Sequence, residues 1–282
     1  MHATQATSRP GRALLSLVHT AFLALAAVGL AMASPPAIAD DDPWPDIRRD
    51  VFANRDIAEE DGTITLEAPY RAEDAAVVPL TMRIPASVAA NVKSLTLVID
   101  KNPAPVAATF TFGKAAGDGE RMLSTRVRID MYSNVRAVIE TGDGKLHMTT
   151  KYVKASGGCS APAGKDMDEA LANLGKMQIK SFAPAADRTP GTREAQVMIR
   201  HPNYTGMQMD QLTREYTPAK FVQELEVKRG GELVFRMDSG ISISENPHFR
   251  FTFASSSDDT LEVTAKDTDG KVFKATSADK AT

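Results

Sequence analysis

The feature that most constrains the fold is a series of short segments in which apolar and polar residues alternate. In the first of them, Ile64, Leu66 and Ala68 alternate with more polar neighbours. A period of two is typical of a β-strand that buries one face. Because no helical pattern separates the segments, they predict an antiparallel β-sandwich. The other segments lie at 76–84, 94–100, 107–112, 124–132, 135–140 and 146–153.

A second group of alternating segments occupies the C-terminal third of the chain. Phe249, Phe251 and Phe253 lie on one face of a predicted strand, and Arg229-Gly230-Gly231 predicts a hairpin turn. This group predicts a second sandwich, so the expected fold class is all-β with two antiparallel β-sandwich domains. Its other segments lie at 195–199, 221–228, 232–238, 261–266 and 271–275.

Two short helices are expected outside the sandwiches. Apolar residues recur at helical spacing within 40–60, after Pro43, and again within 166–180, where Asp166 and Glu169 resemble a capping box. The second helix lies in a linker between the sandwiches. The apolar positions are Trp44, Ile47, Val51 and Phe52 in the first helix, and Met167, Ala170, Leu171, Leu174 and Met177 in the second.

The N-terminus has the pattern of a secretory signal peptide. Arg9 and Arg12 precede an apolar run at 13–32, and Ala37-Ile38-Ala39 gives a small-x-small cleavage site. We expect the mature protein to begin at Asp40, in an exported and periplasmic location without a membrane segment. The alternative is an uncleaved membrane anchor. The predicted divisions are 1–39 signal peptide, 40–155 first sandwich, 156–190 cysteine-bearing linker and 191–282 second sandwich.

The linker holds the chain's one cysteine, Cys159. Gly157 and Gly158 precede it, and glycines let the backbone move and approach a partner closely. We therefore interpret Cys159 as an exposed, reactive thiol. An exported protein with an odd cysteine has either an intermolecular disulfide or a reactive thiol. The alternative is an exposed linker cysteine without a role.

Other kinds of site have weaker signals. His147, His201 or His248 could form a Cys–His dyad with Cys159, but none is near it in the chain. Arg126, Arg128 and Arg136 could bind an anion, although a solvated strand face is the simpler interpretation. Basic residues are scattered and aromatic residues make up 6% of the chain, which argues against nucleic-acid binding. Copper ligands could come from His201, Met207, Met209 and His248, but their spacing is not diagnostic, so no metal or cofactor is expected.

Several motifs resemble the SoxY and SoxZ families of sulfur-oxidation carriers, in that order along the chain. The chain is similar in particular to fused SoxYZ-like carriers associated with quinoprotein dehydrogenases. The SoxY-like motifs are Ala68 to Asp74, Val77 to Pro79, Lys101 to Phe110, Ser124 to Arg128, Val135 to Val138 and Gly157 to Cys159. The SoxZ-like motifs are Ile199 to Pro202, Thr205 to Met207, Pro218 to Glu224 and Ser244 to Phe249.

The resemblance implies two immunoglobulin-like domains that pack together and a covalent sulfur-containing cargo on Cys159. Gly157 and Gly158 would give the arm its mobility. Partners would be periplasmic Sox-type enzymes or a quinoprotein dehydrogenase and its cytochrome, and the carrier would not turn over by itself. In the two-subunit family the cysteine lies between two glycine pairs at the end of the SoxY chain. Here Ser160-Ala161-Pro162 follows it, so the arm is tethered at both ends.

Overall fold

The computed structural model describes residue 2 and residues 42–162, 172–182, 190–210 and 213–277. Residues from Pro43 onward form one compact unit. Two β-sheets make up this unit, with a core of buried side chains drawn from both. The prediction of an all-β fold with two immunoglobulin-like sandwiches is confirmed.

The first half of the unit contains strands β1 to β8. Their pairing is antiparallel except at β1, which runs parallel to β8. The short helices α3 (Ala86–Ala89) and η1 (Lys114–Ala116) lie between strands. The strands are β1 (Ile57–Glu59), β2 (Thr65–Glu67), β3 (Val78–Ile84), β4 (Val92–Ile99), β5 (Val106–Phe112), β6 (Arg121–Val127), β7 (Ser133–Thr141) and β8 (Leu146–Val153).

The second half contains strands β9 to β15, all paired in antiparallel fashion. Phe249, Phe251 and Phe253 are buried on one face of β13, as predicted. The strands are β9 (Met177–Phe182), β10 (Thr192–Ile199), β11 (Val222–Arg229), β12 (Glu232–Ser239), β13 (His248–Ala254), β14 (Leu261–Asp267) and β15 (Val272–Thr276).

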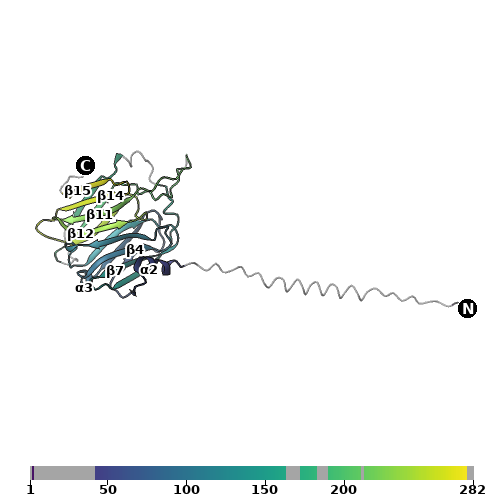
Figure 1. Ribbon diagram of the computed structural model, residues 1–282, viewed down its shortest axis with the longest axis horizontal. Coiled ribbons are helices and arrows are strands. Elements are labelled where there is room, and N and C mark those ends of the chain that lie inside the picture. The colour runs from purple at the N-terminus through teal and green to yellow at the C-terminus, as the bar shows by residue number, and fades with distance from the viewer. Residues whose placement is uncertain (1, 3–41, 163–171, 183–189, 211–212, 278–282) are drawn as a thin grey trace. The chain divides into compact units, whose positions relative to one another are not determined.

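Both sheets continue from one half into the other. Among the described residues, one sheet has the order β1-β8-β7-β4-β5-β12-β11-β14-β15, and the other has the order β2-β3-β6-β13-β10-β9. Figure 1 shows β15, β14, β11 and β12 followed by β4 and β7 in the first of these sheets. The halves meet where β5 pairs with β12 and β6 pairs with β13. The two sandwiches are therefore joined edge to edge through backbone hydrogen bonds.

Aromatic side chains from both halves pack together at this junction. Phe110 of β5 lies edge-on to Phe235 of β12 and to Phe249 of β13, at centroid distances of 5.8 and 6.2 Å. Phe235 is in turn edge-on to Phe251, at 5.0 Å. All four rings are buried, and aromatic pairs in this geometry contribute beyond their buried area. The junction thus has a hydrophobic core of its own.

Helix α2 (Trp44–Phe52) covers a second, smaller apolar cluster. Ile47 and Phe52 are buried there, against side chains of β4, β7 and β8. Arg136 stacks on the Trp44 ring at 4.0 Å and forms an ion pair with Asp100. The helix predicted after Pro43 is confirmed, and it begins at Trp44.

The predicted linker helix is wrong at its C-terminal end. Residues 177–180 belong to strand β9, which pairs with β10 at the edge of the second sheet. Met177 and Ile179 pack against the core from this strand. Alternation and helical spacing cannot be distinguished over so few apolar positions. The predicted start of the helix falls within 163–171, outside the described residues.

The alternation predicted for 124–132 also fails after Val127, where β6 ends. Arg128 was expected on the solvated face and is fully buried. Continued alternation from Val127 would place Met131 in the core, but Met131 is 54% exposed. Beyond the last strand residue the chain no longer has a pleat to keep alternate side chains on opposite faces. This departure places Arg128 beside the cysteine.

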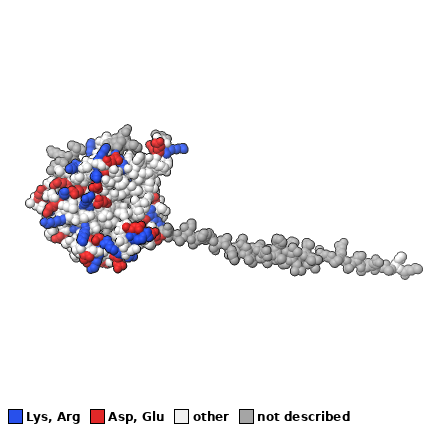
Figure 2. All heavy atoms as spheres, in the orientation of Figure 1, with Lys and Arg blue, Asp and Glu red and all other residues white. Residues whose placement is uncertain are grey.

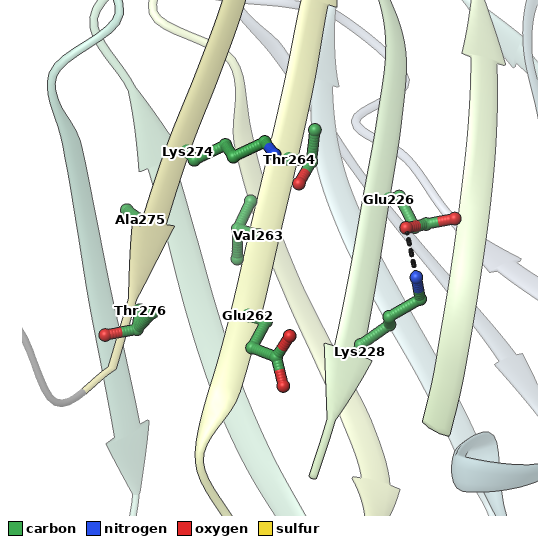
Figure 3. A pocket seen from close by; sticks show the side chains of 8 residues that line it. All are labelled: Glu226, Lys228, Glu262, Val263, Thr264, Lys274, Ala275 and Thr276. Carbon is green, nitrogen blue, oxygen red and sulfur yellow. Dashed lines mark ion pairs between the residues drawn. The ribbon is translucent and has the colours of Figure 1, made fainter. Parts of the chain in front are cut away.

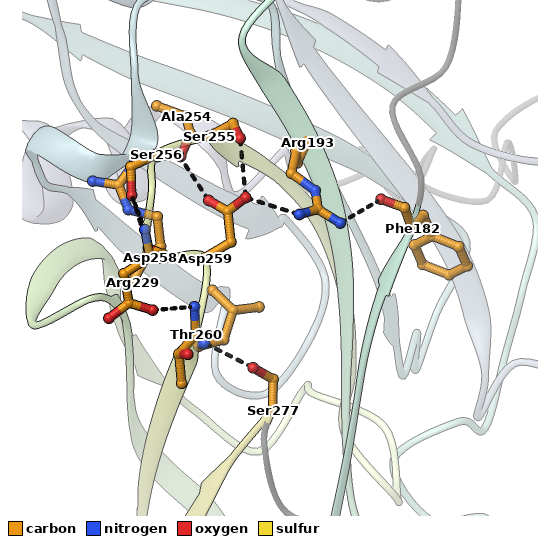
Figure 4. Close-up of polar contacts among 11 residues, drawn as sticks. Phe182, Arg193, Arg229, Ala254, Ser255, Ser256, Asp258, Asp259, Thr260 and Ser277 are labelled. Carbon is orange, nitrogen blue, oxygen red and sulfur yellow. Dashed lines mark hydrogen bonds and ion pairs between the residues drawn. The ribbon is translucent and has the colours of Figure 1, made fainter.

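Two arginines bond to residues at and near the turn between β13 and β14. Arg193 of β10 bonds to Asp259 and to the carbonyl oxygen of Phe182, and Arg229 of β11 bonds to the carbonyl oxygen of Ala254. Figure 4 shows how these contacts gather around the turn between β13 and β14. Arg193 thus connects the turn to β9, the edge strand of the second sheet, and Arg229 connects β11 to the end of β13.

The surface carries both signs of charge. Figure 2 shows Lys and Arg interspersed with Asp and Glu over the visible face. Ion pairs join Glu224 to Arg236 and Lys266, and Glu226 to Lys228. Within the described part of the chain, we find no helix with the length and hydropathy that a membrane crossing requires.

Candidate functional site

The segment around Cys159 is docked on the first half through its backbone. After β8, the N–H groups of Gly157 and Gly158 donate to the carbonyl oxygens of Asp130 and Ile129, at 2.8 and 3.0 Å. The N–H of Cys159 is 3.3 Å from the Asp130 carboxylate, to which it donates. Three successive N–H groups therefore hold this segment, here called the arm (residues 156–162), to residues 129 and 130.

Both glycines are required by the docked geometry. Gly157 has a φ of +77°, in the left-handed region that disfavours other residues. A Cβ at Gly158 would lie 2.1 Å from the carbonyl oxygen of Ala75 and 2.7 Å from that of Ile129. The sequence predicted that these glycines make the arm mobile. The structure does not test that mobility, but it shows that they let the arm pack closely against the backbone.

The second half contributes the other side of the site. The Thr205 hydroxyl lies 2.6 Å from the carbonyl oxygen of Cys159 and donates to it. Thr205 is itself buried, and its N–H donates to the Gln208 side-chain oxygen at 2.8 Å. Cys159 thus lies where the two halves meet, between residues 129–130 and the loop that contains Thr205.

A network of hydrogen bonds holds the arm against both halves. It involves Arg128, Asn102 and Ser242. The Arg128 N–H donates to the carbonyl oxygen of Ser242, and Asn102 Nδ2 donates to that of Arg128, both at 2.8 Å. Asn102 Oδ1 accepts from the N–H of Asp130 at 2.9 Å. Arg128 Nη1 reaches the carbonyl oxygen of Gly158 at 3.1 Å. One buried network therefore connects the arm, the first half and the second half.

The thiol itself is buried, with no exposed surface. Burial, and to a smaller extent the nearby Asp130 carboxylate, raise the pKa of Cys159 to about 12, although Arg128 opposes the change. The thiol is therefore protonated at neutral pH, and a protonated thiol is a poor nucleophile. The expectation of an exposed thiol is wrong for this conformation, because the glycines that suggested exposure allow close packing.

The three arginines considered as an anion patch do not form one. Arg136 is buried and ion-paired with Asp100, whose Oδ2 lies 2.9 Å from Arg136 Nη2. Arg126 is half-buried, and its Nη2 lies 3.5 Å from the carbonyl oxygen of Asn246. Of the three, Arg128 is the one that bonds to the arm. The three arginines therefore form neither an anion-binding patch nor a solvated strand face.

Two of the three histidines contact partners other than the cysteine. His147 Nδ1 lies 2.5 Å from an Asp61 carboxylate oxygen. His201 is buried: its Nδ1 accepts from the Asn203 N–H at 3.1 Å, and its Nε2 lies 3.6 Å from Asp267. Burial lowers the pKa of His201, and likewise that of His248. These contacts give no support to a Cys–His dyad.

Two further kinds of site were considered. In the described ranges, no group of three or more His, Cys, Asp or Glu side chains is placed to hold a metal ion. A shallow hollow lies over β11, β14 and β15, where Glu226 and Lys228 form an ion pair (Figure 3). Its lining includes neither the arm nor the Thr205 loop. The arm therefore remains the strongest candidate site.

Sequence reasoning missed the surroundings of Cys159, although their signal was present. Asn102, Arg128 and Thr205 each lie in one of the family-like motifs, and the fold brings these separate motifs to the cysteine. Asp130, which lies two residues after the fourth SoxY-like motif, was not singled out. The sequence alone does not show that these positions, which lie in different halves, are close together in space.

Two protein families match separate parts of this chain. The family described as "Sulfur oxidation protein SoxY" matches residues 48–159, and that described as "Sulphur oxidation protein SoxZ" matches residues 179–278. A solved structure of the sulfur carrier protein SoxY from Chlorobium limicola f thiosulfatophilum is 25% identical over 40% of this chain and 91% of its own, with a TM-score of 0.33. A search of curated proteins gave no match.

The fold and site thus define a class: two β-sandwiches that share their sheets, with one cysteine held at their junction. The first family match ends at that cysteine, and the second begins within β9. The chain is a fused SoxY–SoxZ-like protein, with the two family domains in tandem.

Proposed function

We propose that this protein is a periplasmic carrier that holds a sulfur-containing group covalently on Cys159 and delivers it to partner enzymes of sulfur-compound oxidation. The main support is the coincidence of the chain's one cysteine with the end of the SoxY match, directly after two glycines. The signal-peptide pattern at 1–39 supports export. The SoxY and SoxZ matches favour a carrier that has no turnover by itself.

The chemistry requires the arm to leave its docked position. Once solvated, the Cys159 thiol loses its proton to solvent, and the thiolate attacks the sulfur atom of an electrophile. A new S–S bond forms while the leaving group departs with the electron pair of the broken bond. Attack by a second nucleophile on the carried sulfur reverses these roles and returns the Cys159 thiolate. The carrier needs no base of its own for either step.

Intact mass measurement tests the proposal. Protein purified from its periplasm without reductant should carry an added mass that maps to Cys159 and disappears with dithiothreitol. A Cys159→Ser variant should show no such addition. A bare thiol after exposure to sulfur donors and partner enzymes would contradict covalent carriage.

A second function is favoured by the burial of Cys159, since a thiol with a pKa of about 12 is inert while docked. The chain would then be an accessory subunit of a periplasmic quinoprotein dehydrogenase and its cytochrome, with the cysteine incidental. In that case Cys159→Ser should retain both partner binding and growth on the relevant substrate. Loss of growth with retained partner binding would favour the carrier.

A further inference from the structure

His201 lies in the Thr205 loop (residues 200–208), and its buried ring is held in one protonation state. Nδ1 accepts a hydrogen bond from the N–H of Asn203 at 3.1 Å, so Nδ1 carries no proton. Nε2 faces Asp267 Oδ2 at 3.6 Å, and neither atom has a hydrogen-bond partner among the described residues. A buried imidazolium would lie about 2.7–2.9 Å from this carboxylate. The ring is therefore neutral, with its proton on Nε2.

A proton on Nδ1 is incompatible with this arrangement of the loop. The imidazolium donates from both nitrogens, so its Nδ1–H would face the N–H of Asn203. Asn203 is fully buried and has a φ of +44°, an uncommon left-handed conformation that needs support from its surroundings. Its side chain bonds to the carbonyl oxygen of Ile243 and to the N–H of Val222, at 3.2 and 3.1 Å. Protonation of His201 thus removes one of the bonds that hold Asn203 in place.

The same short segment reaches the cysteine. The Thr205 hydroxyl donates to the carbonyl oxygen of Cys159 at 2.6 Å. Only Tyr204 separates Thr205 from Asn203 in the chain. Hydrogen bonds weaken steeply as their geometry degrades, so a displacement that begins at Asn203 also weakens the bond from Thr205. The protonation state of His201 is therefore coupled to the docking of the arm.

The surroundings of His201 favour its neutral form. Burial lowers the pKa of His201, whereas Asp267 and the Asn203 side chain oppose this change, and Lys220 adds to the lowering. The Phe273 ring of β15 lies edge-on to the imidazole at 6.4 Å and brings no charge. The charged groups around His201 and Asp267 come from β14, the turn after it and the segment before β11, and they are Asp267, Asp269, Lys271 and Lys220.

We propose that His201 is a positioning residue for the arm: its neutral ring keeps Thr205 bonded to Cys159, and uptake of a proton from solvent by Nδ1 releases the arm. Because docking lowers the pKa of His201, its contribution to docking is fully present above the ordinary value of 6.5. This contribution is lost as pH falls through the lower pKa of the docked state. Control of delivery by this release rests on the proposed carrier function, whereas the docking itself does not.

The reagent 2,2′-dipyridyl disulfide tests the inference, because it reacts with thiols at acidic pH. The Cys159 sulfur attacks the disulfide, forms a mixed disulfide and displaces pyridine-2-thione, whose absorbance gives the rate. Protection is the rate for the urea-unfolded protein divided by that for the folded protein at the same pH, so the titrations of reagent and free thiol cancel. Between about pH 7.5 and about pH 5, protection should fall roughly 5- to 30-fold, as for the loss of one buried hydrogen bond.

Two histidine variants identify the group responsible. His201→Asn keeps an acceptor near the position of Nδ1 but does not titrate, so its protection should stay high across this range. His248→Asn is the matched control, because burial also lowers the pKa of His248, which lies on β13. It should keep the full fall in protection. Asp130, an acidic group that also faces the arm, is unchanged in both variants.

Nuclear magnetic resonance of protein with ¹⁵N-labelled histidine gives a readout that a merely structural role would not move. The signal of His201 is identified by its loss in His201→Asn. At neutral pH it should be that of a neutral ring protonated on Nε2. Its titration midpoint should coincide with the midpoint of the fall in protection. Two midpoints that differ by more than about one pH unit would contradict the coupling.

If His201→Asn does not fold, Thr205→Val still decides the question. Without the hydroxyl, protection should be low at neutral pH and nearly independent of pH, while Thr205→Ser should retain the natural response. Constant protection in the natural protein, or an unchanged fall in His201→Asn or Thr205→Val, would overturn the inference. All these measurements use the empty thiol, so they do not bear on whether purified protein carries a group on Cys159, which intact mass decides separately.

Discussion

Cys159 combines the position of a carrier thiol with the environment of an inert one. It follows two glycines, yet it is fully buried and its pKa is raised to about 12. Only a small fraction of such a thiol is ionised near neutral pH. Reaction must therefore proceed through a conformation in which the arm has left residues 129 and 130. While the arm is docked, burial shields the thiol from reagents in solution.

The raised pKa gives docking a dependence on pH. The folded state favours the neutral thiol. The contribution of this thiol to the stability of the folded state is therefore fully present below the pKa of a solvated cysteine, near 8.5, and is lost as pH rises toward 12. Between about pH 8.5 and 11 the natural protein should lose melting temperature faster than Cys159→Ala. Other groups titrate in this range, but they do so in both proteins. Parallel melting curves across this range would contradict the assignment.

The arm is an element defined by close backbone packing. A methyl group at Gly158 would meet the carbonyl oxygens of Ala75 and Ile129 at 2.1 and 2.7 Å. Gly158→Ala should therefore open the arm, and iodoacetamide should label Cys159 between about fivefold and a hundredfold faster, as for an overpacking cost of ~1–3 kcal/mol. The rate is measured by mass spectrometry under conditions where the rest of the protein stays folded.

Gly62→Ala is the matched control for this substitution. Gly62 has a positive φ, of +80°, which Gly158 does not have, but a Cβ at Gly62 would have no atom within 4 Å. Both variants replace a glycine by alanine; Gly62→Ala adds backbone strain at a positive φ, whereas Gly158→Ala adds a collision with the arm's binding surface. Gly62→Ala should leave the labelling rate unchanged. Equal labelling of both variants would mean that close packing at Gly158 does not control access to the thiol.

The arm also shows which features sequence alone could predict and which it could not. The alternation of apolar residues predicted most strands of both halves, and the helix after Pro43, because these patterns are local. The docking of the arm was not predictable, since it depends on bonds from Gly157 to Asp130 and from Thr205 to Cys159. Such contacts join residues 27 and 46 positions apart. Glycines in a linker favour mobility and close packing equally well.

At the scale of the whole molecule, the two halves behave as one body. The pairing of β5 with β12 and of β6 with β13 makes each sheet continuous. Each half by itself was expected to be a separate sandwich, because sequence patterns identify strands but not the edges at which they pair. The site depends on this pairing, since Arg128 and Thr205 come from different halves.

This continuity predicts that the halves will assemble without a covalent connection. Residues 40–162 and 172–282, expressed as two chains in one cell, should purify together, because Phe110 packs among Phe235 and Phe249 at the junction. Phe110→Ala should remove about 3–5 kcal/mol of that packing and separate the chains. Phe52→Ala deletes another buried ring, which belongs to α2 and lies away from the junction, and should leave the two chains together. If the two unsubstituted chains fold but elute separately, the halves do not share a core. If both substitutions separate the chains equally, the junction aromatics have no special part in holding the halves together.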